Sequence, residues 1–196
     1  MKTRPYHHGD LRAALLARAE RTLRERGPGA LSLRELAREA GVSPAAPSYH
    51  FKGKQALLDA LGLEGFDRLT AALTGALEQA GDSFADRLDA VARAYVDFAV
   101  ANAALHDLMF AFKYGPTASG ELAAARQRLG DLATGLIEGG QRRGEVREGP
   151  VDRIALPLDA TLQGLATLAV SGAIPAERIR QSLDDAIALI LHGCTP

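Results

Sequence analysis

The sequence predicts an all-α protein of nine helices, with a helix-turn-helix domain at 1–53 and a larger helical domain at 54–196. Alanine and leucine dominate the composition, aromatic residues are only 5% of the chain, and β-branched runs are scarce. This mixture favours helix over sheet. Apolar residues also recur three or four positions apart along most of the chain, which is the spacing of a helix face.

The first helix is expected to run from Asp10, a good N-cap, to Arg26, with Gly27-Pro28-Gly29 as its stop. A capping box marks the next helix, with Ser32 as N-cap and Glu35 three residues later. The flanking Leu31 and Leu36 stand where a hydrophobic staple is found. This helix should end at Ala40, since Gly41 can adopt the left-handed conformation of a tight turn.

Ser43 is expected to cap a third helix that starts at Pro44 and reaches about Phe51. Two helices joined by so short a turn have the spacing of a helix-turn-helix. Lys52-Gly53 then separates this motif from six further helices. We expect them at 54–80, from Ser83, at 103–113, from 119 to about 138, at 150–171 with a bend at Pro157, and at 175–192.

The charge distribution indicates a polyanionic partner at the N-terminal end. Residues 1–55 contain 11 Lys/Arg and 5 Asp/Glu, a net charge of +6, and the remainder contains 12 and 19, a net charge of −7. A single cysteine excludes an internal disulfide, and without a Cys/His cluster a zinc finger is excluded too. We find no secretory signal and no membrane-spanning stretch, so a cytoplasmic location is expected.

In a helix-turn-helix the second helix lies in the major groove while neighbouring groups hold the phosphates. The segment from Pro44 to His50 offers small apolar groups and hydroxyls, which suit thymine methyls and phosphate oxygens. Arg34, inside the preceding helix, is the best candidate for a guanine contact. The expected phosphate contacts are Ser32, Tyr49, His50 and Lys54.

The run SLRELAREAGVSPAAPSYHFKGKQALL closely resembles the DNA-binding signature of the TetR family of bacterial repressors, within a resemblance that covers residues 7–62. It implies that bases are faced by Arg34, Pro44, Ala45 and Ala46, and phosphates by Ser32, Tyr49, His50 and Lys54. The family usually has Leu-Tyr where this chain has Pro47-Ser48, so Tyr49 is the candidate to replace the missing tyrosine, with Ser48 beside it. Pro47 also removes an early hydrogen bond from a short helix.

The C-terminal half is similar to the TetR subgroup with a Trp-His-Gly motif, through Tyr95-Val96-Asp97-Phe98-Ala99 and Leu108-Met109-Phe110, although only Gly164 of that motif is present. The apolar residues of this half predict a small apolar effector, and no cofactor or metal is expected. The apolar pocket candidates are Tyr95, Phe98, Met109, Phe112 and Leu162, and the polar ones are His106, Asp159 and Gln163. The same apolar residues could equally form plain core, and the polar ones could face solvent or a dimer seam.

The last two helices are expected to form a two-fold homodimer that reads a palindromic operator in duplex DNA. The predicted interface stripes are Ile179, Leu183, Ile187 and Ile190 on one helix, and Leu162, Leu165 and Ala169 on the other. The function predicted is a ligand-responsive repressor, with a DNA-binding regulator or adaptor that has no ligand as the alternative. No phosphate loop, nucleophile elbow or metal-ligand pair supports an enzyme.

Overall fold

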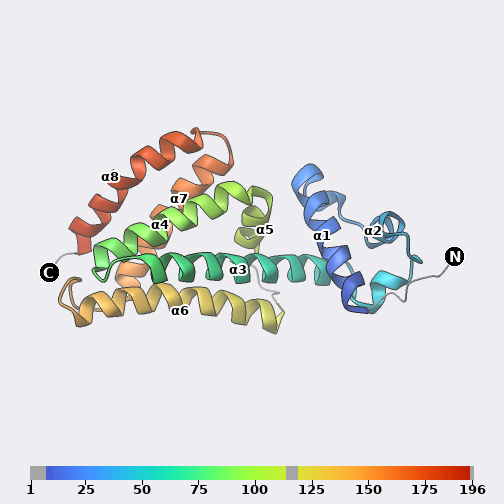
Figure 1. Cartoon of the computed structure of the whole chain (residues 1–196), viewed down its shortest axis with the longest axis horizontal. Helices are drawn as coiled ribbons and strands as arrows, with labels where there is room; N and C mark the ends of the chain where they lie inside the picture. The colour runs from blue at the N-terminus through green and yellow to red at the C-terminus, as the bar shows by residue number, and fades with distance from the viewer. Residues whose placement is uncertain (1–7, 114–118, 195–196) are drawn as a thin grey trace. The chain divides into compact units, whose positions relative to one another are not determined.

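A computed structural model describes residues 8–113 and 119–194, and over those ranges it contains only helices (Figure 1). The α-helices are α1 (His8–Arg26), α2 (Leu33–Ala40), α3 (Lys54–Gln79), α4 (Phe84–Ala101), α5 (Ala103–Lys113), α6 (Gly120–Arg142), α7 (Asp152–Val170) and α8 (Ala176–Cys194). Two short 3₁₀ helices, η1 (Pro28–Ala30) and η2 (Ala46–Tyr49), lie between α1 and α3. None of the described helices is long and apolar enough to cross a membrane.

The count of nine helices is wrong, because the segment after the tight turn is the 3₁₀ helix η2 and not an α-helix. Pro47 has no N–H to donate to the carbonyl of Ser43, as an α-helix would require. The chain instead forms three-residue steps: the N–H of Ala46 donates to the Ser43 carbonyl at 3.0 Å, and the N–H of Ser48 to the Ala45 carbonyl at 3.1 Å. The described residues therefore form eight α-helices.

The helices belong to two compact units, which we describe separately. Unit 1 comprises Met1–Gly65 and Ala104–Ala123, and unit 2 comprises Phe66–Ala103 and Ala124–Pro196. In unit 1, α1 packs against α2 and η1, and its buried residues Leu15, Ala19 and Leu23 recur four apart as expected. The domain boundary expected near residue 53 stays a prediction.

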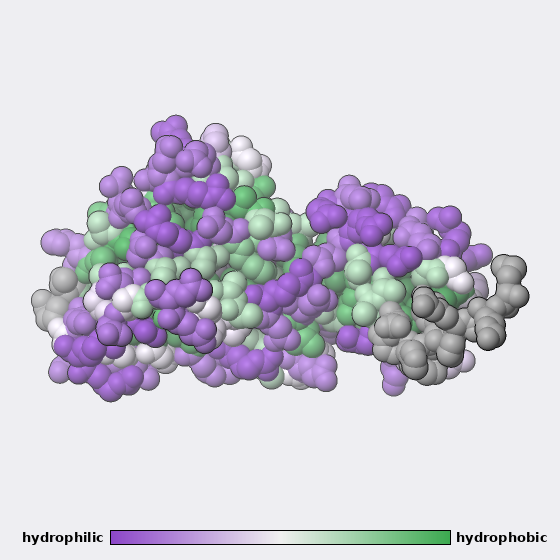
Figure 2. Space-filling view, viewed as in Figure 1, coloured by the Kyte–Doolittle hydropathy of each residue, from purple (hydrophilic) through white to green (hydrophobic). Residues whose placement is uncertain are grey.

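In unit 2, α4, α7 and α8 pack against one another, side by side in Figure 1. Hydrophilic residues cover much of the visible face of each unit (Figure 2). The buried residues of α8 include Ile179, Leu183 and Ile187, which are at most 5% exposed. The assignment of these three residues to a dimer interface is therefore wrong, since they are covered within their own chain, whereas Ile190 of the same predicted stripe is half-buried. Leu162 of α7 is buried in the same way.

Polar contacts hold α4 at both its N-terminus and its flank. The Glu145 carboxylate accepts a hydrogen bond from the backbone N–H of Phe84 at 2.8 Å, and its other partner is Arg143 at 2.9 Å. The Arg143 hydrogen bond is the main reason that the pKa of Glu145 lies below its ordinary value. Along the flank, Arg180 of α8 pairs with Asp97 of α4 at 2.8 Å.

Candidate DNA-binding site

The ends of α2 are set by the residues that the sequence singles out. Ser32 has extended backbone angles (φ −140°, ψ 122°), and its Oγ accepts a hydrogen bond from the Glu35 N–H at 3.5 Å. Gly41 adopts the left-handed conformation (φ 69°, ψ 28°), and the N–H of the following Val42 donates to the Ala37 carbonyl at 3.0 Å. Leu31 and Leu36, at 3% and 1% exposure, are buried as a staple requires. The N-cap and the tight turn are both confirmed.

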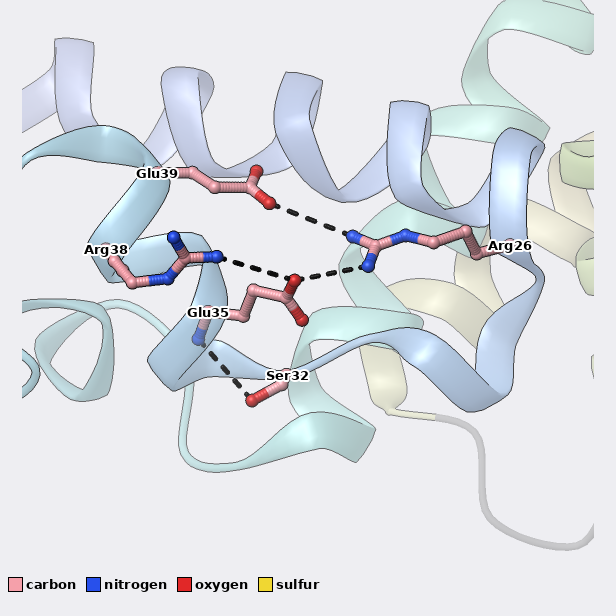
Figure 3. A network of polar contacts seen from close by, with 5 residues as sticks. All are labelled: Arg26, Ser32, Glu35, Arg38 and Glu39. Atoms are coloured by element: carbon pink, nitrogen blue, oxygen red, sulfur yellow. Dashed lines mark hydrogen bonds and ion pairs between the residues drawn. The ribbon is translucent and has the colours of Figure 1, made fainter.

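An ion-pair network joins the end of α1 to α2, as Figure 3 shows. One nitrogen of the Arg26 guanidinium lies 3.1 Å from Glu35, and the other lies 3.7 Å from Glu39. Arg38 approaches the same Glu35 oxygen at 3.8 Å. These side chains are partly exposed, so each pair contributes at most about 1 kcal/mol. The network links the two helices at their exposed side, and no periodicity of the sequence relates Arg26 to Glu35.

The residues predicted to contact DNA all lie in unit 1, on α2, on the segment around η2, and at the start of α3. The exposed ones are Ser32, Arg34, Pro44, Ala45, Ser48, Tyr49 and Lys54, whereas Ala46 and His50 are half-buried. Tyr49 is 86% exposed, which is unusual for so large an aromatic ring. Pro47, by contrast, is buried and anchors η2. Tyr49 therefore points into solvent from η2, which the buried Pro47 attaches to the rest of the unit.

Two of these residues already have partners within the chain. The hydroxyl of Ser32 serves as the cap of α2. The ammonium of Lys54 donates to the backbone carbonyl of Gly29 at 2.9 Å, which ties the start of α3 to η1. A carbonyl is a weaker partner for an ammonium than a phosphate is, because a phosphate carries a full negative charge. Lys54 therefore remains a suitable phosphate ligand.

The effector candidates are divided between the two units. On α4 and α7 of unit 2, Phe98, Leu162 and Gln163 are buried, and Tyr95 and Asp159 are half-buried. On α5 of unit 1, His106 and Met109 are buried at 4% and 3% exposure. The side chain of Phe112 lies outside the described residues. Gln163 is only 8% exposed, but its amide atoms are not among the described side-chain atoms that are both fully buried and without a hydrogen bond.

Two family models match the chain over separate ranges. One, described as bacterial regulatory proteins of the tetR family, matches residues 15–61. The other, described as a tetracyclin repressor-like C-terminal domain, matches residues 88–191 and so covers more than half of the chain. No curated protein matches the chain.

Solved structures of similar proteins share the fold over nearly the whole length. A Rhodococcus sp. RHA1 protein, described as having unknown function, is 45% identical; the match covers 99% of this chain and 100% of that one, with a TM-score of 0.89. A bacterial regulatory protein in the tetR family from Rhodococcus RHA1 is 25% identical over 94% and 97% of the two chains, with a TM-score of 0.72. The TetR family transcriptional regulator PfmR from Thermus thermophilus is 25% identical over 91% and 97%, with a TM-score of 0.66.

Proposed function

This chain belongs to the TetR family of bacterial regulatory proteins and is a DNA-binding transcriptional regulator; we propose that it is a ligand-responsive repressor that binds a palindromic operator as a homodimer. The observation that carries the proposal is the exposed set of groups on α2 and η2, with Arg34 and Tyr49 outward, in the part of the chain with a net charge of +6. Such a regulator acts where the chromosome is, so we place it in the cytoplasm.

The DNA contacts are tested by comparing two variants at several salt concentrations. Arg34→Ala should cost about 1–3 kcal/mol of binding free energy and relax specificity at one base, since an arginine fork reads guanine. Lys54→Ala should weaken binding to every sequence alike and lower the slope of log K against log salt by about 0.9. Arg142→Ala, at an exposed position on α6, is the control and should change neither. If wild-type protein fails to bind any duplex at low salt, the proposed function is wrong.

Exposed leucines support a homodimer built on α7 and α8. Leu156 and Leu168 on α7 are 68% and 39% exposed, and Leu189 on α8 is 76% exposed. Large apolar side chains left in water are stabilised when a second copy covers them. In a two-fold interface each subunit contributes the same surface. The three leucines of one copy would therefore face the same region of the second copy. We therefore propose the outer faces of α7 and α8 as the interface, in place of the buried stripe.

For the effector, we propose a small, largely apolar molecule that binds between α4 and α7, which pack against each other. Phe98 and Leu162 supply apolar surface there, and the amide of Gln163 is a polar group that can hydrogen-bond to a ligand. The ligand therefore carries one hydrogen-bonding group on an apolar body. Gln163→Leu should abolish the response to effector, because it removes the proposed hydrogen bond to the ligand, and should leave the protein folded.

A thermal-shift screen of such compounds, followed by titration with and without DNA, tests this part. Linkage requires that DNA weakens effector binding by the same factor by which effector weakens DNA binding, typically about 5–150-fold. A screen that finds only compounds with equal affinity for free and DNA-bound protein would favour the alternative, a DNA-binding regulator without a ligand.

A further inference from the structure

We infer that Arg12, on the first turns of α1, is a further phosphate-binding residue, and that the ring of Phe51 holds its guanidinium in place. The inference rests on the DNA contacts proposed above, to which it adds a residue from a different helix. Arg12 is exposed, and its Cζ lies 5.6 Å from the centroid of the Phe51 ring. The ring itself is only 2% exposed, so it is a fixed platform.

This arrangement leaves the donors of Arg12 available. A guanidinium attracted to the face of an aromatic ring keeps its five N–H groups in its own plane, at its edges. Within the part of the chain that the structure describes, no carboxylate pairs with Arg12. The arginines of the neighbouring network differ in this respect, since Arg26 and Arg38 are held by Glu35. Arg12 thus carries an uncompensated charge on a preformed support.

The position of the platform places Arg12 beside the other phosphate candidates. Phe51 directly follows His50, and the two ring centroids are 6.4 Å apart. Lys54 begins α3 three residues later. An anion that reaches His50 and Lys54 therefore lies next to the platform on which the Arg12 guanidinium rests.

The support has an energetic consequence for DNA binding. A free arginine side chain loses rotamer entropy when it is fixed, and a guanidinium already held against a ring loses less. The segment around η2 has no long hydrogen-bonding side chain of its own between Pro44 and Ser48. Contacts to the phosphate backbone from neighbouring elements therefore carry a larger share of the affinity.

The test measures binding of a mixed-sequence DNA duplex to the full chain over a range of salt concentrations. Each phosphate contact contributes about 0.9 to the slope of log K against log salt. For Arg12→Gln, the affinity advantage of wild type should shrink by about 3.5-fold between roughly 50 and 200 mM salt, which is a fourfold change raised to the power 0.9. Arg12→Lys keeps the charge and should keep the wild-type slope while losing part of the affinity.

Arg21→Gln is the matched control. Arg21 is also exposed on α1, but it lies about two and a half turns further on and so faces away from Arg12. It should leave both affinity and slope unchanged. An unchanged slope for Arg12→Gln, or an equal change for Arg21→Gln, would overturn the inference, even if the melting temperature fell. Failure of wild type to bind DNA at all would instead count against the proposed function.

Discussion

Leu189 and Ile187 lie two residues apart on α8, yet an aspartate should act differently at the two positions. At Leu189 it should weaken the dimer, and at Ile187 it should prevent the protomer from folding. Leu189 is 76% exposed in the chain, and Ile187 is 5% exposed. Leu189→Asp should change the stability of the folded protomer by no more than about 0.5 kcal/mol, as surface substitutions usually do. Ile187→Asp places a charge in the contact between α8 and its neighbours and should prevent stable folding.

The effect of Leu189→Asp on the dimer follows from the exposed fraction. Burial of a whole leucine side chain contributes about 1.5–3 kcal/mol, so covering the 76% that is exposed contributes about 1.1–2.3 kcal/mol per copy. A two-fold interface contains the residue twice, which gives about 2.3–4.6 kcal/mol. The dimer dissociation constant should therefore rise by roughly 50- to 2,000-fold.

Sedimentation equilibrium over a concentration series measures this change, with thermal melting of each variant beside it. Ala124→Asp, at an exposed position on α6, is the control and should leave the dimer intact. If Leu189→Asp keeps the wild-type dissociation constant, the outer face of α8 is not the interface. A folded, monomeric Ile187→Asp protein would show that our account of the inward face of α8 is wrong.

Two further predictions concern stability alone. Gly41→Ala should lower the free energy of unfolding by about 1–2 kcal/mol, since Gly41 has a left-handed backbone (φ 69°). Gly75→Ala, inside α3 with open space around it, should raise it by up to about 1 kcal/mol. Equal effects of the two variants in denaturant unfolding would contradict the turn geometry at Gly41. The Arg143 hydrogen bond lowers the pKa of Glu145 in the folded protein, so its stabilising contribution is present above the ordinary glutamate pKa and is lost as the pH falls through the folded value. Glu145→Gln should therefore reduce the dependence of the melting temperature on pH in that acid range. The same pH dependence in the variant and in wild type would contradict the stabilising role of Glu145.

The features that could be predicted from the sequence are those that depend on neighbours within about four residues. The cap of α2 requires only Ser32 and the backbone N–H of Glu35, and the turn requires only a residue that tolerates the left-handed conformation, which Gly41 supplies. The replacement of the third helix by η2 belongs to the same class, since Pro47 lacks the donor that an α-helix needs there. The helix-turn-helix spacing favours an α-helix at this segment, but the missing N–H of Pro47 prevents it.

Only the tertiary structure determines which element each helix face packs against. The period of Ile179, Leu183 and Ile187 shows that α8 has an apolar side, but the same period suits a dimer seam and a contact within the chain. Packing against α4 and α7 settles the choice, and it leaves Leu189 for another surface. The pairs Arg26–Glu35 and Arg12–Phe51 join residues 9 and 39 positions apart. No rule of helix periodicity connects such residues, because the turns between the elements determine their approach.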